Sequence, residues 1–375
     1  MIRKKRVVCA ISGGVDSSVA AARLALPGEA GEQARYGANF DVIGVFMKLV
    51  NLPRFRESEK KAKKVASILK IPFLSLDLRK EFKKRIIDYF LKEYERGLTP
   101  NPCVVCNKEI KFGLLLEKAL TLGADYIATG HYARKQPTTY NLQPTTYKLL
   151  SAKDKEKDQS YFLWQLNQKQ LKHILFPIGD YTKKQVRELA KKFKLPVSNS
   201  KESQEICFIQ TTINDFLKRH LKPKPGKIID TKGKTIGQHQ DLTFYTIGQR
   251  KGIKLPGGPF YVLDKDFKKN LLIVTKNEKD LYKKELICQN INWLSGKEPK
   301  LPLKVKAKIR YRHPSASAIL TYELRNLKTY KLTFQKPQRA ITPGQSVVFY
   351  KNNEVLGGGI IEKITKKCNI KAYEI

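Results

Sequence analysis

The segment Ser12–Ser18, near the start of the chain, constrains the fold more than any other part of the sequence. The apolar run Arg6–Ile11 before it is typical of a buried parallel strand, and the Ala- and Leu-rich run Val19–Leu26 after it favours a helix. In such a strand–turn–helix, backbone N–H groups converge on an anion, and Gly13 and Gly14 leave room for a phosphate. The segment lacks the spacing and the lysine of a Walker A loop, so it predicts a shorter phosphate-binding turn.

Polar side chains strengthen this interpretation. Ser12, Ser17 and Ser18 offer hydroxyl donors, and Asp16 is placed to orient a magnesium ion. The alternative is a helix cap that binds nothing, but a cap requires fewer glycines, serines and acids than this turn carries.

Strands and helices alternate over the next two hundred residues. This order predicts an α/β domain with a doubly wound parallel sheet, whose ligands bind beyond the carboxyl ends of the strands. A twice-occurring Gln-Pro-Thr-Thr-Tyr within Gln136–Tyr147 indicates a surface hairpin, and Pro27–Asn39 has the composition of a loop. The expected strands are 41–48, 73–76 and 125–129, and the expected helices are 57–70, 80–96, one ending at Leu122, and 182–193 with a capping box at Thr182 and Gln185.

The second half of the chain has a different character. After a Pro- and Gly-containing hinge near residue 223, helical periodicity gives way to short β-rich runs separated by turn residues. We expect an α/β catalytic domain at 1–222, a small central β domain at 223–295 and a C-terminal β-barrel at 296–375. The expected strands of this half are 242–247, 260–263, 271–274, 303–311, 316–322, 330–334 and 346–350.

The charge of the chain points to a polyanionic partner. The sequence has 73 Lys and Arg against 34 Asp and Glu, a formal net charge of +39. Such an excess favours nucleic acid as the partner, although lysine spread along a whole chain also results from a genome-wide bias. No apolar run approaches the length of a membrane span, so we expect a cytoplasmic protein with mostly reduced cysteines and no membrane contact.

Three cysteines are candidates for chemistry. Cys103 and Cys106 lie in a proline-containing loop that leads into a helix, where a thiol pKa is expected to fall, and Cys207 follows about a hundred residues later. A zinc site needs a fourth ligand, for which only His131 is available, and a thioredoxin-type motif normally follows a strand. An iron–sulfur cluster on Cys103, Cys106 and Cys207 and a two-thiol pair of Cys106 with Cys207 both remain open.

Taken together, these segments resemble the tRNA-specific 2-thiouridylases, which are N-type ATP pyrophosphatases. The resemblance runs in order over nearly the whole chain. It is carried by Ser12–Ser18, Gly44–Met47, Thr99–Pro102, Cys106–Phe112, Ala128–Ala133, Lys157–Leu163, Ile206–Ile209, Thr246–Gly252, Arg310–Arg312, Pro343–Tyr350 and Gly357–Ile360.

The resemblance implies ATP-dependent 2-thiolation of the wobble uridine in tRNA anticodons of the Lys, Glu and Gln type, with Mg²⁺ and a sulfur-relay or cysteine-desulfurase donor. It implies Cys106 as nucleophile, Cys207 as persulfide carrier and a catalytic Cys106–Cys207 disulfide. The residues that it assigns to ATP are Ala10, Ile11, Ser12, Gly13, Gly14, Val15, Asp16, Ser17, Met47 and Gly130. Those that it assigns to the target base or the tRNA are Asn101, Pro102, Cys103, His131, Lys157, Asp158, Gln159, Arg310, Tyr311 and Gln345.

Two departures from the family pattern matter. Cys103 stands where many relatives carry Asp, which strengthens the iron–sulfur alternative, and Ser203–Glu205 replaces the usual residues before Cys207. Other N-type enzymes, such as an iron–sulfur-dependent thiolase, an amide-forming synthetase or a lysidine-type ligase, share the glycine turn. The last two do not require paired cysteines. A non-catalytic RNA-binding protein would bind tRNA without consuming ATP.

Overall fold

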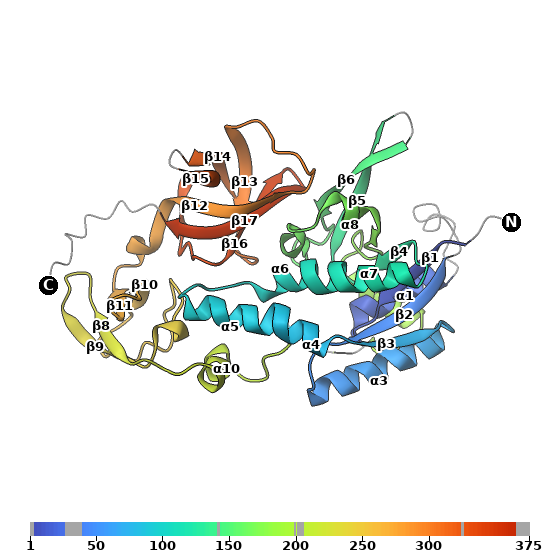
Figure 1. The fold of residues 1–375 in the computed structure, drawn as a ribbon, viewed down its shortest axis with the longest axis horizontal. Helices are drawn as coiled ribbons and strands as arrows, with labels where there is room; N and C mark the ends of the chain where they lie inside the picture. The colour runs from blue at the N-terminus through green and yellow to red at the C-terminus, as the bar shows by residue number, and fades with distance from the viewer. Residues whose placement is uncertain are drawn as a thin grey trace.

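The computed structural model describes residues 4–26, 40–140, 143–198, 200, 206–323 and 326–364. Three sheets follow one another along the chain, and two long helical segments run between the first sheet and the other two (Figure 1). The predicted loop at 27–39 and the residues Ser203–Glu205 and Cys368 lie outside the described residues.

The first sheet has the order β3-β2-β1-β4-β7, and all its pairings are parallel. Val7 and Cys9 of β1 pack on the helices of one face, and Val8 and Ala10 pack on a helix of the other. The predicted doubly wound sheet is therefore confirmed, and its strand order reverses between β1 and β4. The strands are β1 (Arg6–Ala10), β2 (Asp41–Lys48), β3 (Phe73–Asp77), β4 (Tyr126–Ala128) and β7 (Ile174–Leu175).

The helices of this domain agree with the sequence except at their ends. The predicted capping box is present, since the Gln185 N–H donates to Thr182 Oγ1 and the Thr182 N–H donates to Gln185 Oε1. Two long helices contain π-turns and are linked by Arg85 and Glu109, 2.9 Å apart. The helical segments are α1 (Val15–Ala25), α3 (Pro53–Ile68), α4 (Arg79–Phe82), η1 (Lys83–Ile87), α5 (Asp88–Glu95), α6 (Pro102–Cys106), η2 (Asn107–Leu114), α7 (Leu115–Thr121), η3 (Ser160–Leu163), α8 (Gln168–Lys172), α9 (Lys183–Lys192) and α10 (Ile213–His220).

The hairpin predicted around 136–147 is present as β5 (Ala133–Tyr140) and β6 (Gln143–Ser151). It projects from the first domain in Figure 1, and the base of β6 pairs with strand β17 (Glu354–Ile364) of the C-terminal sheet. The hairpin therefore connects the first domain to the C-terminal sheet.

The central sheet has the order β10-β11-β8-β9. The strand predicted at 242–247 is wrong: these residues begin with the 3₁₀ turn η4 (Leu242–Phe244), because the Asp241 carboxylate accepts the Thr243 N–H at 2.7 Å and caps the turn. The elements are β8 (Gly226–Ile229), β9 (Thr235–His239), β10 (Tyr261–Asp266), β11 (Leu271–Thr275) and the 3₁₀ turn η5 (Glu278–Leu281).

The C-terminal strands form the expected barrel, which closes because β12 pairs with both β15 and β17. Strand β12 lies before the division expected at residue 296, so strand pairing separates the central sheet from the barrel near residue 281 instead. The Gly-, Pro- and Lys-rich stretch 293–302 is a connection inside the barrel. The remaining barrel strands are β12 (Tyr282–Trp293), β13 (Leu303–Lys308), β14 (Ala316–Glu323), β15 (Asn326–Arg339) and β16 (Ser346–Lys351).

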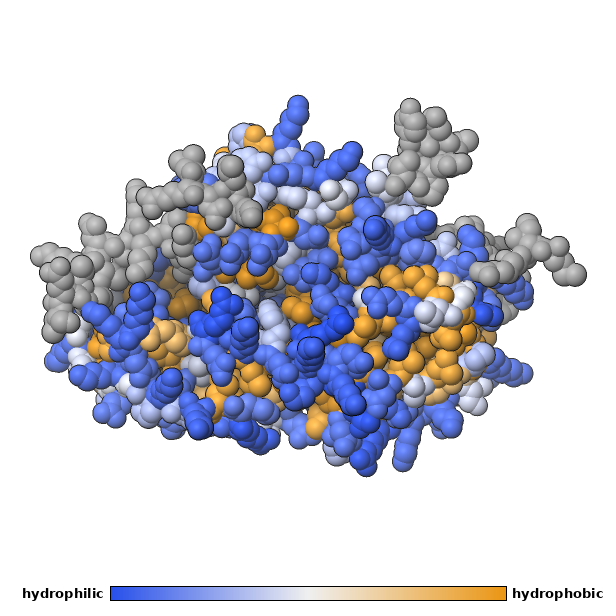
Figure 2. Space-filling view, viewed as in Figure 1, coloured by the Kyte–Doolittle hydropathy of each residue, from blue (hydrophilic) through white to orange (hydrophobic). Residues whose placement is uncertain are grey.

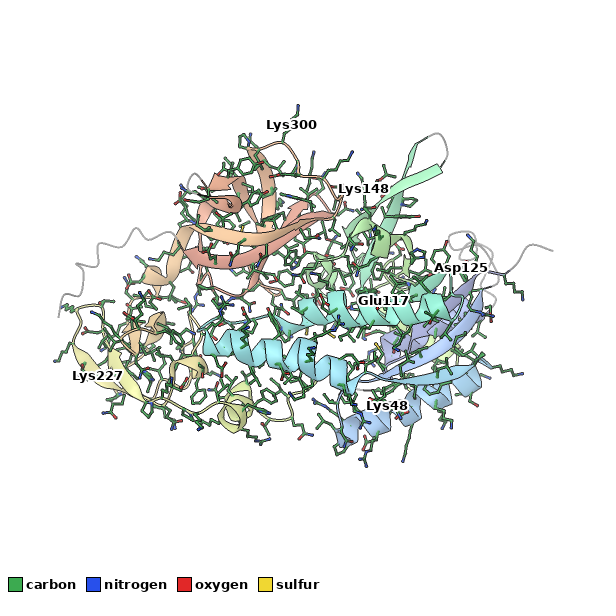
Figure 3. The ribbon with its side chains drawn as sticks, viewed as in Figure 1. Lys48, Glu117, Asp125, Lys148, Lys227 and Lys300 are labelled. Carbon is green, nitrogen blue, oxygen red and sulfur yellow. The ribbon has the colours of Figure 1, made fainter. Side chains whose placement is uncertain are left out.

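Basic side chains are distributed over the whole molecule. Lys48, Lys148, Lys227 and Lys300 extend from four separate parts of the ribbon (Figure 3), and hydrophilic residues cover most of the face drawn in Figure 2. Within the described ranges, we find no helix with the length and apolar character needed to cross a bilayer.

Candidate active site

The glycine turn lies where the strand order reverses, directly after β1. Gly13 has a φ of 78°, and a Cβ there would lie 2.3 Å from the Ser58 carbonyl oxygen, so the turn requires glycine at this position. Gly14 is the N-cap of α1 and has open space where a Cβ would be, with Ser12 Oγ nearest at 3.7 Å. The turn is therefore rigid at Gly13 and accessible at Gly14.

Two of the three serines serve the turn itself. Ser17 Oγ accepts the Ser12 N–H at 3.0 Å, and Ser18 Oγ donates to the Gly14 carbonyl at 2.7 Å. Ser17 and Ser18 are buried, whereas Ser12 is exposed. Of the three predicted hydroxyl donors, Ser12 is therefore the one that faces a ligand from the outside.

The end of β4 closes against this turn. A Cβ on Gly130 would lie 2.5 Å from the Ser17 backbone nitrogen, so only glycine allows the two segments to approach this closely. Asp16 Oδ1 accepts a hydrogen bond from the Tyr132 hydroxyl at 2.9 Å and forms an ion pair with Lys183 Nζ at 2.6 Å. Asp16 thus ties α1 to the segment after β4 and to α9.

The other residues that the sequence assigned to ATP lie at the same edge of the sheet. Ala10 and Ile11 are buried at the end of β1, where the Ile11 N–H donates to the Val45 carbonyl at 2.8 Å. Met47, at the end of β2, packs against two hydrophobic clusters, one containing helix α7 and the other containing Cys106. The structure therefore brings the predicted nucleotide residues together and connects them to the cysteine region through Met47.

The cysteine loop becomes helical earlier than the sequence predicts. Helix α6 begins at Pro102, which stands at the first helical position, and the predicted start near Asn107 is wrong. Cys103 is exposed in the first turn, whereas Cys106 is only 7% exposed. Asn107 is buried as well and donates from Nδ2 to the Phe162 carbonyl at 3.2 Å, which fixes the helix on the turn η3.

All three candidate thiols are free, and they lie close enough to influence one another electrostatically. Burial, with smaller contributions from the neighbouring Cys207 and Cys103, raises the pKa of Cys106 to about 12. The protein atoms around the Cys207 thiol raise its pKa to about 11, although the residue as a whole is exposed. The predicted lowering of the Cys106 pKa at a helix N-terminus is therefore wrong, because desolvation of the thiolate dominates.

Lys111 is a functional candidate that the motif analysis did not single out. It is the one lysine whose charge lowers the pKa of all three thiols, Cys103, Cys106 and Cys207. Lys111 lies in the π-turn η2, in which the Leu115 N–H bonds to the Ile110 carbonyl five residues back. In a π-turn, residues five positions apart lie on the same helix face. Lys111 comes five residues after Cys106 and therefore shares its face.

We expect the alkylation rates of Cys106 and Cys207 to rise about tenfold per pH unit from pH 7 to pH 10, because the thiolate fraction grows in that proportion below the pKa. In Lys111→Met both rates should fall by about threefold more, since the opposing positive charge is lost. Lys108→Met is the matched control, because Lys108 is exposed one helical turn away. The measurement is iodoacetamide labelling followed by peptide mass analysis, and a rate plateau near neutral pH would contradict the expectation.

His131 follows the end of β4 and is held as a neutral imidazole. Its Nδ1 and the Thr129 hydroxyl are 2.8 Å apart, and its ring packs against Phe112 and Phe176. Burial lowers the pKa of His131 well below its ordinary value, and the charge of Lys111 lowers it further. His131 is therefore an uncharged ring in this site.

The predicted tRNA residues at 157–159 mostly stabilise their own turn. The buried Asp158 carboxylate accepts hydrogen bonds from the Ala152 and Ser160 N–H groups and from the Ser160 hydroxyl at 3.0–3.1 Å. Gln159 Oε1 accepts the Tyr132 N–H at 3.0 Å. Asp158 and Gln159 thus support the segment around His131. Lys157 is half-buried and carries a positive charge.

Two of the predicted tRNA residues in the barrel connect it to the rest of the molecule. Arg310 Nη2 donates to the Ile247 and Ala340 carbonyls at 3.1 and 2.8 Å and to the Thr342 hydroxyl. Gln345 Nε2 donates to the Thr99 carbonyl at 2.7 Å, two residues before Asn101. Tyr311 packs its ring on Phe162, with ring centroids 4.4 Å apart.

Arg310→Met is expected to lower the melting temperature by about 4 °C, because the loss of a charged donor leaves carbonyls at the boundary of central sheet and barrel unsatisfied. Lys306→Met, on an exposed position of β13, is the control and should melt as the wild type does. Thermal unfolding followed by circular dichroism measures both. Equal melting temperatures would show that these hydrogen bonds do not hold the barrel in place.

Three family models match successive parts of the chain. Residues 5–211 match the tRNA methyl transferase HUP domain, residues 214–276 the tRNA methyl transferase PRC-barrel domain, and residues 283–361 the aminomethyltransferase beta-barrel domain. Among solved structures, the U34-tRNA thiolase NcsA from Methanococcus maripaludis is similar at a TM-score of 0.35 and 17% identity, covering 54% of this chain and 62% of that one. A TM-score this low supports no structural argument.

Curated relatives extend over nearly the whole chain. The tRNA-specific 2-thiouridylase MnmA 2 of Thermoanaerobacter sp. (strain X514) is 47% identical over 379 residues, covering 96% of this chain and 99% of the relative. The tRNA-specific 2-thiouridylase MnmA of Syntrophomonas wolfei subsp. wolfei is 43% identical over 357 residues, covering 95% and 99%. The chain therefore belongs to the tRNA-specific 2-thiouridylase family.

Proposed function

We propose that this protein is a transferase that uses ATP to replace the C2 oxygen of the wobble uridine in tRNA with sulfur. The relatives' names support the reaction. The observation that carries the assignment is the arrangement at the carboxyl edge of the first sheet. There, a glycine turn follows β1, and Met47 packs against the hydrophobic cluster that contains Cys106 and Phe208, the neighbour of Cys207.

The first half of the reaction activates the base. A carbonyl oxygen is a poor leaving group, so the uridine C2 oxygen attacks the α-phosphorus of ATP, and pyrophosphate leaves. We assign the developing negative charge to the N–H groups at the N-terminus of α1, which begins after the N-cap Gly14. The buried Ala10 and Ile11 and the partly buried Met47 give the nucleotide an apolar boundary.

The second half transfers sulfur from a persulfide on Cys207. In one route, the terminal sulfur attacks C2, AMP leaves, and Cys106 then attacks the Cys207 sulfur to release the thiolated base. In the other route, Cys106 attacks the persulfide first and frees sulfide, which displaces AMP. Both routes reduce one sulfur atom and oxidise two thiols to a Cys106–Cys207 disulfide, so each turnover requires an external dithiol reductant.

The target base must leave the anticodon loop to reach these thiols, as in other enzymes that modify bases. Asn101, Pro102 and the exposed Cys103 lie at the start of helix α6, which ends at Cys106, and we propose that they line the entrance to the site. Gln345 holds the carbonyl of Thr99 and thereby supports this entrance. We assign base contacts to this segment and RNA contacts to His131, Lys157 and Tyr311. Asp158, Gln159 and Arg310 act by shaping the surface.

Mg²⁺ and an iron–sulfur cluster are the two cofactors that the sequence suggests besides ATP. Asp16 is the acidic side chain in the turn, and Lys183 and Tyr132 already occupy its Oδ1, so Mg²⁺ would depend on Asp16 Oδ2 and on ATP phosphates. Cys103, Cys106 and Cys207 do not form a metal-binding group of three in the described part of the chain, so we derive no step through an iron–sulfur cluster. A sulfur-relay or desulfurase partner is the source that we propose for the persulfide.

The deciding experiment incubates the purified protein with ATP, a persulfide donor, lysine and tRNA that lacks thiolation, and analyses the nucleosides by mass spectrometry. We expect 2-thiouridine at the wobble position and tRNA-dependent pyrophosphate release. Pyrophosphate release with lysine incorporation would identify a lysidine-type ligase instead. Binding of tRNA without pyrophosphate release would identify a non-catalytic RNA-binding protein.

A further inference from the structure

The segment that carries Cys207 is held at two points. The side chain of Phe208 is buried among the rings of Phe82, Phe90 and Phe216, with ring centroids 5.3–5.9 Å away. On the backbone side, Arg54 Nη2 donates to the Cys207 carbonyl and, at 2.9 Å, to the Ile209 carbonyl. The two attachments therefore fix the chain at Cys207, Phe208 and Ile209.

Arg54 reaches this segment from the other side of the site. It occupies the second position of α3, after Pro53, and α3 follows β2 at the edge of the sheet where Met47 lies. Its charge also lowers the pKa of Cys207, against the larger effect of burial. One guanidinium nitrogen thus donates both of its hydrogens, to the carbonyls of the residues before and after Phe208, and such charge-assisted bonds are stronger than neutral ones.

We infer that Arg54 is a positioning residue that clamps the Cys207 segment so that its sulfur stays within reach of Cys106. This inference rests on the proposed sulfur transfer, in which the two thiols must meet once per turnover. The clamp raises the effective concentration of one thiol at the other, because a free loop would spread Cys207 over many positions. The same charge stabilises the anionic form of the sulfur on Cys207.

The alternative for an exposed arginine in a basic protein is a contact with a tRNA phosphate. The two bonds to carbonyl groups favour the clamp, because they use the guanidinium for the protein's own backbone. The two roles give different results in a direct test. A clamp acts on the thiols in the absence of RNA, whereas a phosphate contact acts only on RNA binding and on its dependence on salt.

The test compares Arg54→Met, Arg54→Lys and Arg56→Met with the wild type. Arg56 is the matched control, since it lies on the same helix with the same charge and bonds only Asn51 Oδ1, at 3.2 Å. The first readout is the rate at which diamide forms the Cys106–Cys207 disulfide in the reduced protein, without ATP or tRNA. The second is tRNA affinity as a function of salt concentration.

We expect disulfide formation to be about tenfold slower in Arg54→Met, the size of the loss of a hydrogen bond from a charged donor. Arg54→Lys should recover only part of the rate, and Arg56→Met should equal the wild type, with tRNA affinity unchanged in all three. An unchanged disulfide rate overturns the clamp. So does a loss of tRNA affinity in Arg54→Met alone, with a salt slope smaller by about one, because that result identifies a phosphate contact.

The disulfide readout does not depend on thiolation. If the wild-type protein forms no 2-thiouridine but the rates still differ as expected, the proposed reaction fails and the clamp stands. If thiolation proceeds and the rates are equal, the clamp fails and the reaction stands.

Discussion

Cys207→Ser is expected to lower the rate of tRNA thiolation by at least about a thousandfold, because a hydroxyl cannot carry a persulfide. Pyrophosphate release in the first turnover and tRNA affinity should stay near their wild-type values. The physical reason is that Cys207 is exposed, while the neighbouring Phe208 and the bonds from Arg54 hold the backbone, so the serine changes the chemistry and leaves the fold intact. Nucleoside mass analysis and a pyrophosphate assay on the same samples separate the two halves of the reaction.

The companion variant is Cys106→Ser, which removes the second thiol and keeps the first. Loaded from a persulfide donor in the absence of tRNA, it should accumulate persulfide on Cys207 that mass analysis of the intact protein detects, because the resolving thiol of Cys106 is missing. Thiolation at wild-type rate in Cys207→Ser would remove Cys207 from the reaction. Cys103→Ser then decides the role of the third thiol: retained thiolation limits Cys103 to lining the entrance.

Gly14→Ala is expected to reduce ATP-dependent pyrophosphate release by about 100-fold while leaving thermal stability unchanged, because the methyl group moves the phosphate away from the N–H groups of the turn and the loss of one such contact costs about that much. At Gly14 a Cβ meets only Ser12 Oγ, at 3.7 Å, and the φ of −96° suits any residue. The added methyl group therefore costs the empty turn nothing and obstructs only a phosphate that approaches the turn. ATP titration and thermal unfolding of the same variant measure the two effects.

Gly13→Ala is expected to differ from Gly14→Ala, because it also changes stability. Its φ of 78° and a Cβ 2.3 Å from the Ser58 carbonyl oxygen should reduce both stability and ATP use. Gly296→Ala is the control for φ alone, since Gly296 has a φ of 76° and nothing within 4 Å of the added Cβ. If Gly14→Ala uses ATP as the wild type does, the phosphates do not approach the turn at this residue.

The segment around Asn101 depends on hydrogen bonds between residues that lie far apart in the sequence. Gln345 of the barrel bonds Thr99, and Arg310 bonds both the central sheet at Ile247 and the barrel at Ala340. The entrance at Asn101 is therefore supported from the C-terminal barrel. Changes at these residues are expected to alter reaction rates through position, even where no substrate touches them.

Local sequence determined those features that depend on neighbouring residues. Apolar runs between turn residues identified β1 and β2, and β2 was predicted with the bounds that the structure has. The glycine turn could be recognised from the sequence because its backbone conformation requires glycine, so the residue type itself reveals the turn. The Thr182 capping box was likewise visible, since it satisfies backbone N–H groups within four residues.

Tertiary structure decided the features that depend on burial and on distant partners. The thiol pKa values follow from how many protein atoms surround Cys106 and Cys207, which a helix-terminus argument does not count. Strand β12 joined the barrel because its pairing partners, β15 and β17, lie at the end of the chain. Lys111 comes near the thiols because it lies in a π-turn. Arg54 contacts the segment of Cys207, which is 153 residues away in the sequence. Local patterns carry no signal for such contacts, because their energy depends on positions that exist only after the chain has folded.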